Sequence, residues 1–191
     1  MTARRKMDDT KELPKRKKIR LKKHDYSSIG AYFVTVCIKD RKPILSDIVE
    51  PVGDGAYDVP PKRDEKNPFI RLKPLGSIIE KHLMSSENIP GVTIDQYVIM
   101  PDHIHAIIFL DPDKYTKRAD GTSRAPSPTN KMLPHIISTF KRFCNREIGE
   151  NVFQRSYVEH VIRNRDDYYK HIKYICNNPI ERYYRERVKT E

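Results

Sequence analysis

The fold of this chain is decided by residues 98–110, which read VIMPDHIHAIIFL. The second half of this stretch is an apolar run rich in β-branched residues, which is typical of a buried strand. Because residues two apart on a strand point to the same face, His103 and His105 should project from the sheet side by side. Two adjacent imidazoles form half of a site for a divalent metal ion. A bare His-x-His is equally compatible with two hydrogen-bonded histidines at the end of a core strand, so a third ligand has to decide.

The other strands and helices are placed by their hydrophobic periodicity. We expect a strand over 92–98, joined to the strand over 103–110 by a tight connection at 100–102, so that the two form an antiparallel hairpin. Three further extended segments are expected, over 31–39, 44–49 and 152–161. Helices are expected over 70–86, 133–148 and 166–178, and Pro179 should end the last of them.

Length and composition suit one domain with appendages. The chain has 191 residues, of which 37% are hydrophobic and 33% charged, and it contains no Trp. Its three cysteines are far apart and form no Cys-x-x-Cys pair, which argues against a disulfide framework and favours a reducing, cytoplasmic location. No apolar stretch approaches the ~20 residues of a membrane helix, and the N-terminus lacks the apolar region of a secretory signal, so we expect no membrane partner.

Positive charge is concentrated at the start of the chain. Residues 1–25 hold eleven Lys or Arg and four Asp or Glu, which is +7 of the net +11. Such a basic arm favours binding to a polyanion, although a solubilising tail would have the same composition. Segments 51–68 and 111–130 should be loops, and 184–191 a basic tail. The candidate phosphate contacts of the arm are Lys15, Arg16, Lys17, Lys18, Arg20, Lys22 and Lys23.

Three further basic residues lie on the helix expected over 133–148. Lys141, Arg142 and Arg146 fall off its buried face, so they are candidates for contacts with DNA phosphates. An ordinary solvated helix face is the alternative, because the chain is basic overall.

The last predicted helix offers a third ligand and a nucleophile. Tyr174 and Asn178 are four residues apart, so they lie on one helical face. If that face looks across the histidine strand, Asn178 can give a carbonyl oxygen to a metal and Tyr174 lies close to the group that the metal polarises. A tyrosine with a pKa near its ordinary value of about 10 is a poor nucleophile at neutral pH, and a divalent cation on the phosphate offsets this. On spacing alone, structural roles are favoured for both: Tyr174 as a helix tyrosine packed on the sheet, and Asn178 as a residue near the helix end before proline.

Three other residues bear on this assignment. Asp102 can orient the imidazole of His103, or it can simply serve the turn. Tyr157 is the rival nucleophile, but it has no ligand four residues further along. For His160 a structural role is favoured over contact with DNA.

The ordered set of motifs resembles the REP-associated tyrosine transposases, a group of single-tyrosine HUH transposases named for their His-hydrophobic-His motif. The resemblance runs from about residue 26 to residue 183. The matching segments are YFVTVCIKDRKPIL, VIMPDHIHAIIFL, STFKRFCN, FQRSYVEHVIRNRDDY and YICNNP. The basic arm, the two long loops and the absence of Trp depart from the family pattern.

The resemblance implies an α+β fold, namely a ferredoxin-like antiparallel sheet packed with helices. It implies Mg²⁺ or Mn²⁺ at His103 and His105, with Asn178 completing the metal site and Tyr174 as the nucleophile. Family substrates are single-stranded DNA, often hairpins, cut without a nucleotide cofactor. Relatives act as monomers or homodimers, with the tyrosine helix in cis or in trans.

The resulting hypothesis is a metal-dependent single-stranded DNA endonuclease and strand transferase. It works through a covalent 5′-phosphotyrosine. The runner-up is a nucleic-acid-binding regulator that keeps the scaffold without cleavage. A metal-dependent hydrolase that uses activated water is the third reading.

Overall fold

The computed structural model describes residues 30–50, 67–115 and 132–188. The basic arm predicted over residues 1–25 lies outside the described residues, as do most of the two predicted loops and the end of the predicted tail.

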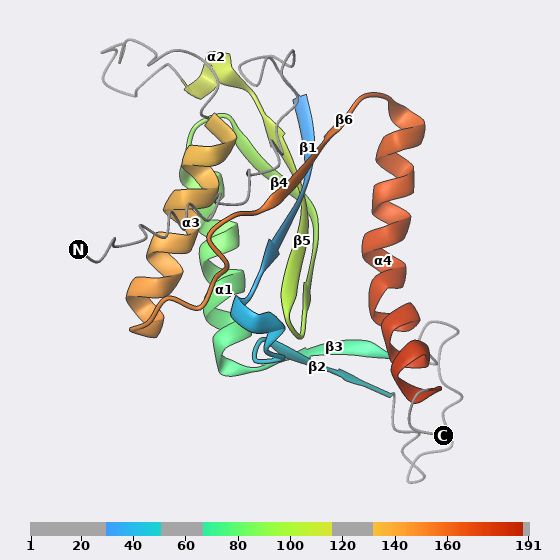
Figure 1. Cartoon of the computed structure of the whole chain (residues 1–191). Coiled ribbons are helices and arrows are strands. Elements are labelled where there is room, and N and C mark those ends of the chain that lie inside the picture. Colours follow the sequence, from blue (N-terminus) through green and yellow to red (C-terminus); the bar gives the residue numbers. More distant parts are fainter. Residues whose placement is uncertain (1–29, 51–66, 116–131, 189–191) are drawn as a thin grey trace, which may run out of the picture.

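A four-stranded antiparallel sheet forms the centre of the structure (Figure 1). Its strands lie in the order β4-β5-β1-β6, and helices α1 and α3 connect β1 to β4 and β5 to β6. This β-α-β-β-α-β order with these strand neighbours is the ferredoxin-like arrangement, so the predicted fold class is confirmed. The bounds are β1 Gly30–Cys37, β4 Val92–Met100, β5 His103–Leu110, β6 Val158–Ile162, α1 Pro74–Ser85 and α3 Met132–Ile148.

Side-chain alternation along the strands gives the sheet two different faces. One face is aliphatic and packs against α1 and α3, which lie together on that side (Figure 1). The other face carries Phe33 and Thr35 from β1 and both histidines from β5. The residues of the aliphatic face include Tyr32, Val34 and Val36 of β1, Ile104, Ala106, Ile108 and Leu110 of β5, and Ile136, Ile137, Phe140 and Cys144 of α3.

Helix α4, Arg165–Arg187, covers the second face of the sheet (Figure 1). Asn164 caps its N-terminus by accepting the backbone N–H of Asp167 at 2.8 Å. The prediction that Pro179 ends this helix was wrong, because the helix continues to Arg187. A proline removes one N–H donor, but contacts made beyond it hold the last two turns in place. Arg182 pairs with Asp102 and Arg187 with Glu50.

A small hairpin beside the main sheet corrects a second expectation. Residues 69–72 pair with β2 as strand β3, so the helix expected from residue 70 begins only at Pro74. Proline is favoured at a first helical position because its missing N–H has no partner there anyway. A Cβ on Gly76 would lie 2.1 Å from the carbonyl oxygen of Leu45, so only glycine permits this close packing. The bounds are β2 Ser46–Val49 and β3 Phe69–Leu72.

The remaining predicted elements are close to those observed. The strand expected over 103–110 has these bounds, and the strand expected over 92–98 runs two residues further. The extended piece expected over 152–161 is β6 together with a single bridge between Ile38 and Phe153. The short elements are α2 Pro112–Tyr115 and two 3-10 turns, η1 Lys39–Arg41 and η2 Ser86–Asn88.

Candidate active site

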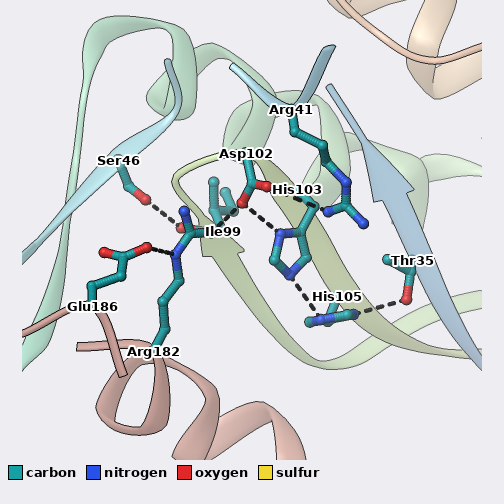
Figure 2. A network of polar contacts seen from close by, with 9 residues as sticks. All are labelled: Thr35, Arg41, Ser46, Ile99, Asp102, His103, His105, Arg182 and Glu186. Atoms are coloured by element: carbon teal, nitrogen blue, oxygen red, sulfur yellow. Dashed lines mark hydrogen bonds and ion pairs between the residues drawn. The ribbon is translucent and has the colours of Figure 1, made fainter. Parts of the chain in front are cut away.

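The two histidines of β5 point their ring nitrogens at each other (Figure 2). The Nε2 atoms of His103 and His105 are 3.0 Å apart. The Nδ1 atom of His103 lies 2.8 Å from Oδ1 of Asp102, and the Nδ1 atom of His105 lies 2.9 Å from Oγ1 of Thr35. Thr35 reaches this position because β1 pairs with β5 in a register that sets it opposite His105. Each ring is therefore oriented by a hydrogen bond at its Nδ1 atom, and the two Nε2 atoms point toward each other.

The hydrogen bonds of the pair define which nitrogens carry protons. A carboxylate only accepts, so the Nδ1 of His103 donates to Asp102 and its Nε2 presents a lone pair. The Nε2–H of His105 then donates to that lone pair, and the Thr35 hydroxyl donates to Nδ1 of His105. If the His105 proton moves to Nδ1, Thr35 becomes the acceptor, and the Nε2 atoms of both histidines then offer lone pairs to a shared ligand. Outer partners of this kind are typical of metal-binding histidines, so the pair fits a divalent cation.

Burial keeps both imidazoles neutral. Removal from water lowers the pKa of His103, against the opposing pull of the Asp102 carboxylate. Burial, the neighbouring His103 and the Arg41 guanidinium together lower the pKa of His105 to about 3. A metal binds only the unprotonated imidazole, so the pair is ready to act as a ligand at neutral pH.

Asp102 joins the histidine strand to α4. Its Oδ1 accepts from both His103 and the Arg182 guanidinium, and its Oδ2 lies 3.4 Å from Nη1 of Arg41 (Figure 2). Burial alone would raise the pKa of Asp102, but the hydrogen bonds from His103 and Arg182 lower it below its ordinary value. The expected contact between Asp102 and His103 is thus present, and it belongs to a larger network of charges.

Arg41 reaches this network from a strained turn. Asp40 and Arg41 have φ values of 56° and 54°, which place two consecutive non-glycine residues in the left-handed region. Such residues persist where the surroundings hold them. Here the backbone N–H of Ile38 donates to the Asp102 carbonyl at 3.0 Å and that of Lys39 to the Val152 carbonyl at 2.8 Å. The turn is fixed at the edge of the site, where its guanidinium faces Asp102.

Tyr174 lies beside the histidine pair. Its ring centroid is 5.1 Å from that of His105 in an edge-on arrangement, and 43% of the residue is exposed. Tyr174, Asn178 and Arg182 follow one another at intervals of four on α4, so they share the face that looks at the sheet. Asn178 is buried, and it is not among the residues that line the cavity at the histidines.

Tyr174 and His105 stand between two hollows. The first, of about 600 Å³, holds both histidines, two carboxylates and three arginines; the second, of about 410 Å³, holds Phe33, His171, one carboxylate and two lysines. Thr35, His105 and Tyr174 line both, so the two hollows adjoin at the tyrosine. Cations on both sides of the tyrosine suit a polyanion. The arginines are Arg41, Arg182 and Arg185; the second hollow is lined in part by Phe33, Lys170 and Lys173.

The predicted basic residues of α3 are not brought to this site. Helix α3 lies on the opposite face of the sheet from α4 (Figure 1). The ammonium of Lys141 donates to the carbonyls of Gln154 at 2.8 Å and Ser156 at 3.1 Å, and burial lowers the pKa of Lys141 to about 8. Arg142 and Arg146 are exposed.

Tyr157, the rival nucleophile, also lies away from the histidines. Its ring sits 6.0 Å from the ammonium of Lys141, on the α3 side of the sheet, and its hydroxyl is buried. Of the two candidate nucleophiles, Tyr174 and Tyr157, the structure therefore places Tyr174 beside the pair.

Sequence reasoning missed three residues of the site. Thr35 lies in a segment that the sequence marks only as a strand, because its alignment with His105 depends on strand pairing. Arg41 depends on an unusual turn. Arg182 carried a signal, since it is eight residues after Tyr174, but the helix was expected to end at Pro179.

No helix within the described ranges is both long enough and apolar enough to cross a membrane.

Comparison with known proteins gives two sequence relatives and several structural neighbours. No family model matches the chain. An uncharacterised protein of Haemophilus influenzae is 32% identical over 180 residues, which cover 86% of this chain and 88% of that protein. A second H. influenzae protein, provisionally named a REP-associated tyrosine transposase, is 26% identical over 168 residues, covering 87% of this chain and 80% of that protein.

One structural neighbour is a REP-associated tyrosine transposase solved in complex with a REP hairpin. It aligns with a TM-score of 0.51 and 19% identity, over 85% of this chain and 74% of that chain. At this identity the likeness bears on the fold.

Proposed function

This chain belongs to the REP-associated tyrosine transposase family, and from that premise we propose that it is a transposase that cuts and rejoins single-stranded DNA through Tyr174. The observation that carries the proposal is the position of Tyr174, whose ring lies 5.1 Å from that of His105 and between two hollows lined by cations. A phosphodiester that crosses the tyrosine would meet the nucleophile and the histidine pair together.

His103, His105 and Asn178 would hold the metal ion of the site, Mg²⁺ or Mn²⁺. When bound, such a cation makes the phosphorus more electrophilic and offsets the charge that develops on the phosphate oxygens. The convergent Nε2 atoms and the neutral state of both imidazoles support this assignment. The part given to Asn178 requires its amide to turn toward the histidines from the helix face that it shares with Tyr174.

The covalent step exchanges one ester bond for another. The oxygen of Tyr174 forms a bond to phosphorus as the bond from phosphorus to the 3′ oxygen breaks. The departing oxygen takes up a proton in place of the one lost by the phenol, and the DNA is left with a 5′-phosphotyrosyl end and a free 3′-OH. The phosphotyrosyl ester replaces the phosphodiester that was cut, so the bond energy is kept. A second 3′-OH can therefore attack this ester and rejoin the DNA without a nucleotide cofactor.

The substrate is proposed to be DNA that carries a hairpin, since the structural neighbour was solved with one. Helix α4 packs on β4 and β5 of its own chain, which supports a site completed in cis and a protein able to act as a monomer. All three cysteines are free thiols, which supports the cytoplasm as the place of action.

The test is incubation of the protein with end-labelled hairpin DNA and Mn²⁺, followed by a denaturing gel. We expect a protein–DNA adduct that survives denaturation and that the substitution Tyr174→Phe removes. Tyr184→Phe is the matched control, since Tyr184 is an exposed tyrosine on the same helix.

Several hairpins with different flanking sequences are tested, so that a negative result does not depend on the choice of one DNA substrate. If wild type forms no adduct with any of them but binds them in a salt-sensitive way, the protein is a binding regulator and the proposal fails. If Tyr174→Phe still turns over the DNA, the water-activated hydrolase is correct instead.

A further inference from the structure

A second group of metal-ligand side chains lies on the same face of the sheet, near the start of α4. His160 of β6 and Asp167 and His171 of α4 each place one ligand atom within 4.8 Å of the other two. Oδ2 of Asp167 is 2.8 Å from Nε2 of His160, and its Oδ1 is 3.3 Å from Nδ1 of His171. The carboxylate therefore lies beside two imidazoles that come from two different elements, and Nδ1 of His171 is also 2.7 Å from the backbone carbonyl of Asp167.

These separations are close to those around a tetrahedral ion. Zinc bonds of about 2.0–2.1 Å place neighbouring ligand atoms about 3.3 Å apart. The imidazole rings of His160 and His171 stack with centroids 4.7 Å apart and planes at 25°, so both edges can turn toward a common point. Small side-chain rotations would bring the three ligand atoms around one ion.

The donor set favours a borderline first-row cation. Two imidazoles and one carboxylate are a ligand set typical of Zn²⁺. Burial tends to raise the pKa of Asp167, but hydrogen bonds from His160 and from the Arg163 N–H lower it, so the carboxylate is charged. The His160 side chain is 46% exposed, which leaves a path for the ion and room for water as a fourth ligand.

Helix capping accounts for only part of this arrangement. The Arg163 N–H donates to Oδ2 of Asp167 at 3.2 Å, and Asn164 accepts the Asp167 N–H, which together close the first turn. Neither contact needs an imidazole. The cap positions the carboxylate, while His160 and His171 supply ring nitrogens. Nδ1 of His171 donates to the backbone carbonyl of Asp167 at 2.7 Å, and a metal ion would replace that contact.

We propose that His160, Asp167 and His171 form a zinc site that ties the edge strand β6 to the first turns of α4. The site is separate from the pair at His103 and His105. Its effect would reach the nucleophile through a row of rings, because Phe33 lies 4.6 Å from His171 and 5.9 Å from Tyr174. A zinc ion there would steady the helix that carries Tyr174.

The experiment measures zinc bound per chain after equilibrium dialysis, with excess Mg²⁺ present throughout. The double variant His103→Ala/His105→Ala removes the first pair, and we expect it to keep one zinc ion. Adding His160→Ala to it should remove that ion or weaken its binding at least about tenfold. Adding His135→Ala instead, an exposed histidine on α3, should change nothing.

Thermal unfolding of the same variants gives a second readout. Zinc should raise the Tm of the double variant but not that of the triple variant with His160→Ala. If the double variant does not fold, wild type should bind one more zinc ion than His160→Ala alone. Loss of all zinc from the double variant, or full retention after His160→Ala, overturns the proposal. Neither result bears on DNA cleavage, so the two proposals fail separately.

Discussion

The two faces of the central sheet are held by different forces. On one face, β1 and β5 press aliphatic side chains such as Val34 and Ile108 against α1 and α3. On the other face, α4 is fastened largely by polar contacts, among them Tyr168 to Asp95 at 2.7 Å and Arg187 to Glu50 at 2.7 Å. Hydrophobic packing is strong and non-directional, whereas hydrogen bonds and ion pairs fix direction.

This difference separates stability from chemistry within one strand. In β5, Ile104 and Ile108 serve the core while His103 and His105 face α4. A site with buried imidazoles and charged partners costs desolvation, and the opposite face supplies the hydrophobic burial that offsets it. One strand therefore contributes to the hydrophobic core through one face and to the candidate active site through the other.

The largest predicted effect is on the aliphatic face. Ile108→Ala should lower the free energy of unfolding by about 2–5 kcal/mol, because it removes buried methyl groups and leaves a cavity. Urea denaturation measures this effect. Adduct formation per folded molecule should be unchanged at a temperature well below the transition.

The matched control is His103→Ala, on the same strand but the other face. It should abolish or strongly reduce the adduct while leaving the free energy of unfolding within about 1 kcal/mol of wild type. A loss of stability as large as that of Ile108→Ala would show that the two faces are not separate.

The next effect concerns the polar fastening of α4. Arg182→Met should lower the rate of adduct formation about 10–100-fold, since Arg182 shares Asp102 with His103 and helps to orient that ring. Arg182→Lys should recover part of the rate, and Arg185→Met, in the same turn but exposed, should have a smaller effect.

A double-mutant cycle with Asp102→Asn tests whether the two residues act as one unit. If they do, the double variant is no slower than the worse single variant. Additive losses would instead assign Arg182 a separate role, such as direct contact with DNA.

The smallest effect is at the surface between α1 and α3. Glu147 accepts from Lys81 at 2.7 Å and lies 2.7 Å from Nε2 of His82, and these partners lower the pKa of Glu147. A lowered folded-state pKa means stability that is present above the unfolded value and lost as pH falls through the folded value. Glu147→Gln should therefore lower the Tm slightly at pH 7, and the difference from wild type should disappear at acid pH. A difference that persists in acid would assign the effect to packing rather than to charge.

Several elements of the fold could be predicted from the sequence because they depend on local periodicity. The strand over 103–110 and the helix over 133–148 follow from patterns of two and of three to four residues. The predicted helix end at Pro179 was wrong because the true end depends on contacts with distant residues. Local preference ends a helix there, but the bonds that extend α4 come from Asp102 and Glu50, which are distant in sequence.

The chain by itself determined that His103 and His105 share a face and that Tyr174 and Asn178 share another, because side-chain direction repeats with fixed periods in strands and helices. The continuation of that helix to Arg182 depends on contacts with distant residues such as Asp102. Only the tertiary structure decided that these two faces meet. Strand register set Thr35 behind His105, the docking of α4 brought Tyr174 to the pair, and the same docking set His171 against His160. Periodicity is a property of neighbours along the chain, whereas register and docking depend on packing between distant segments.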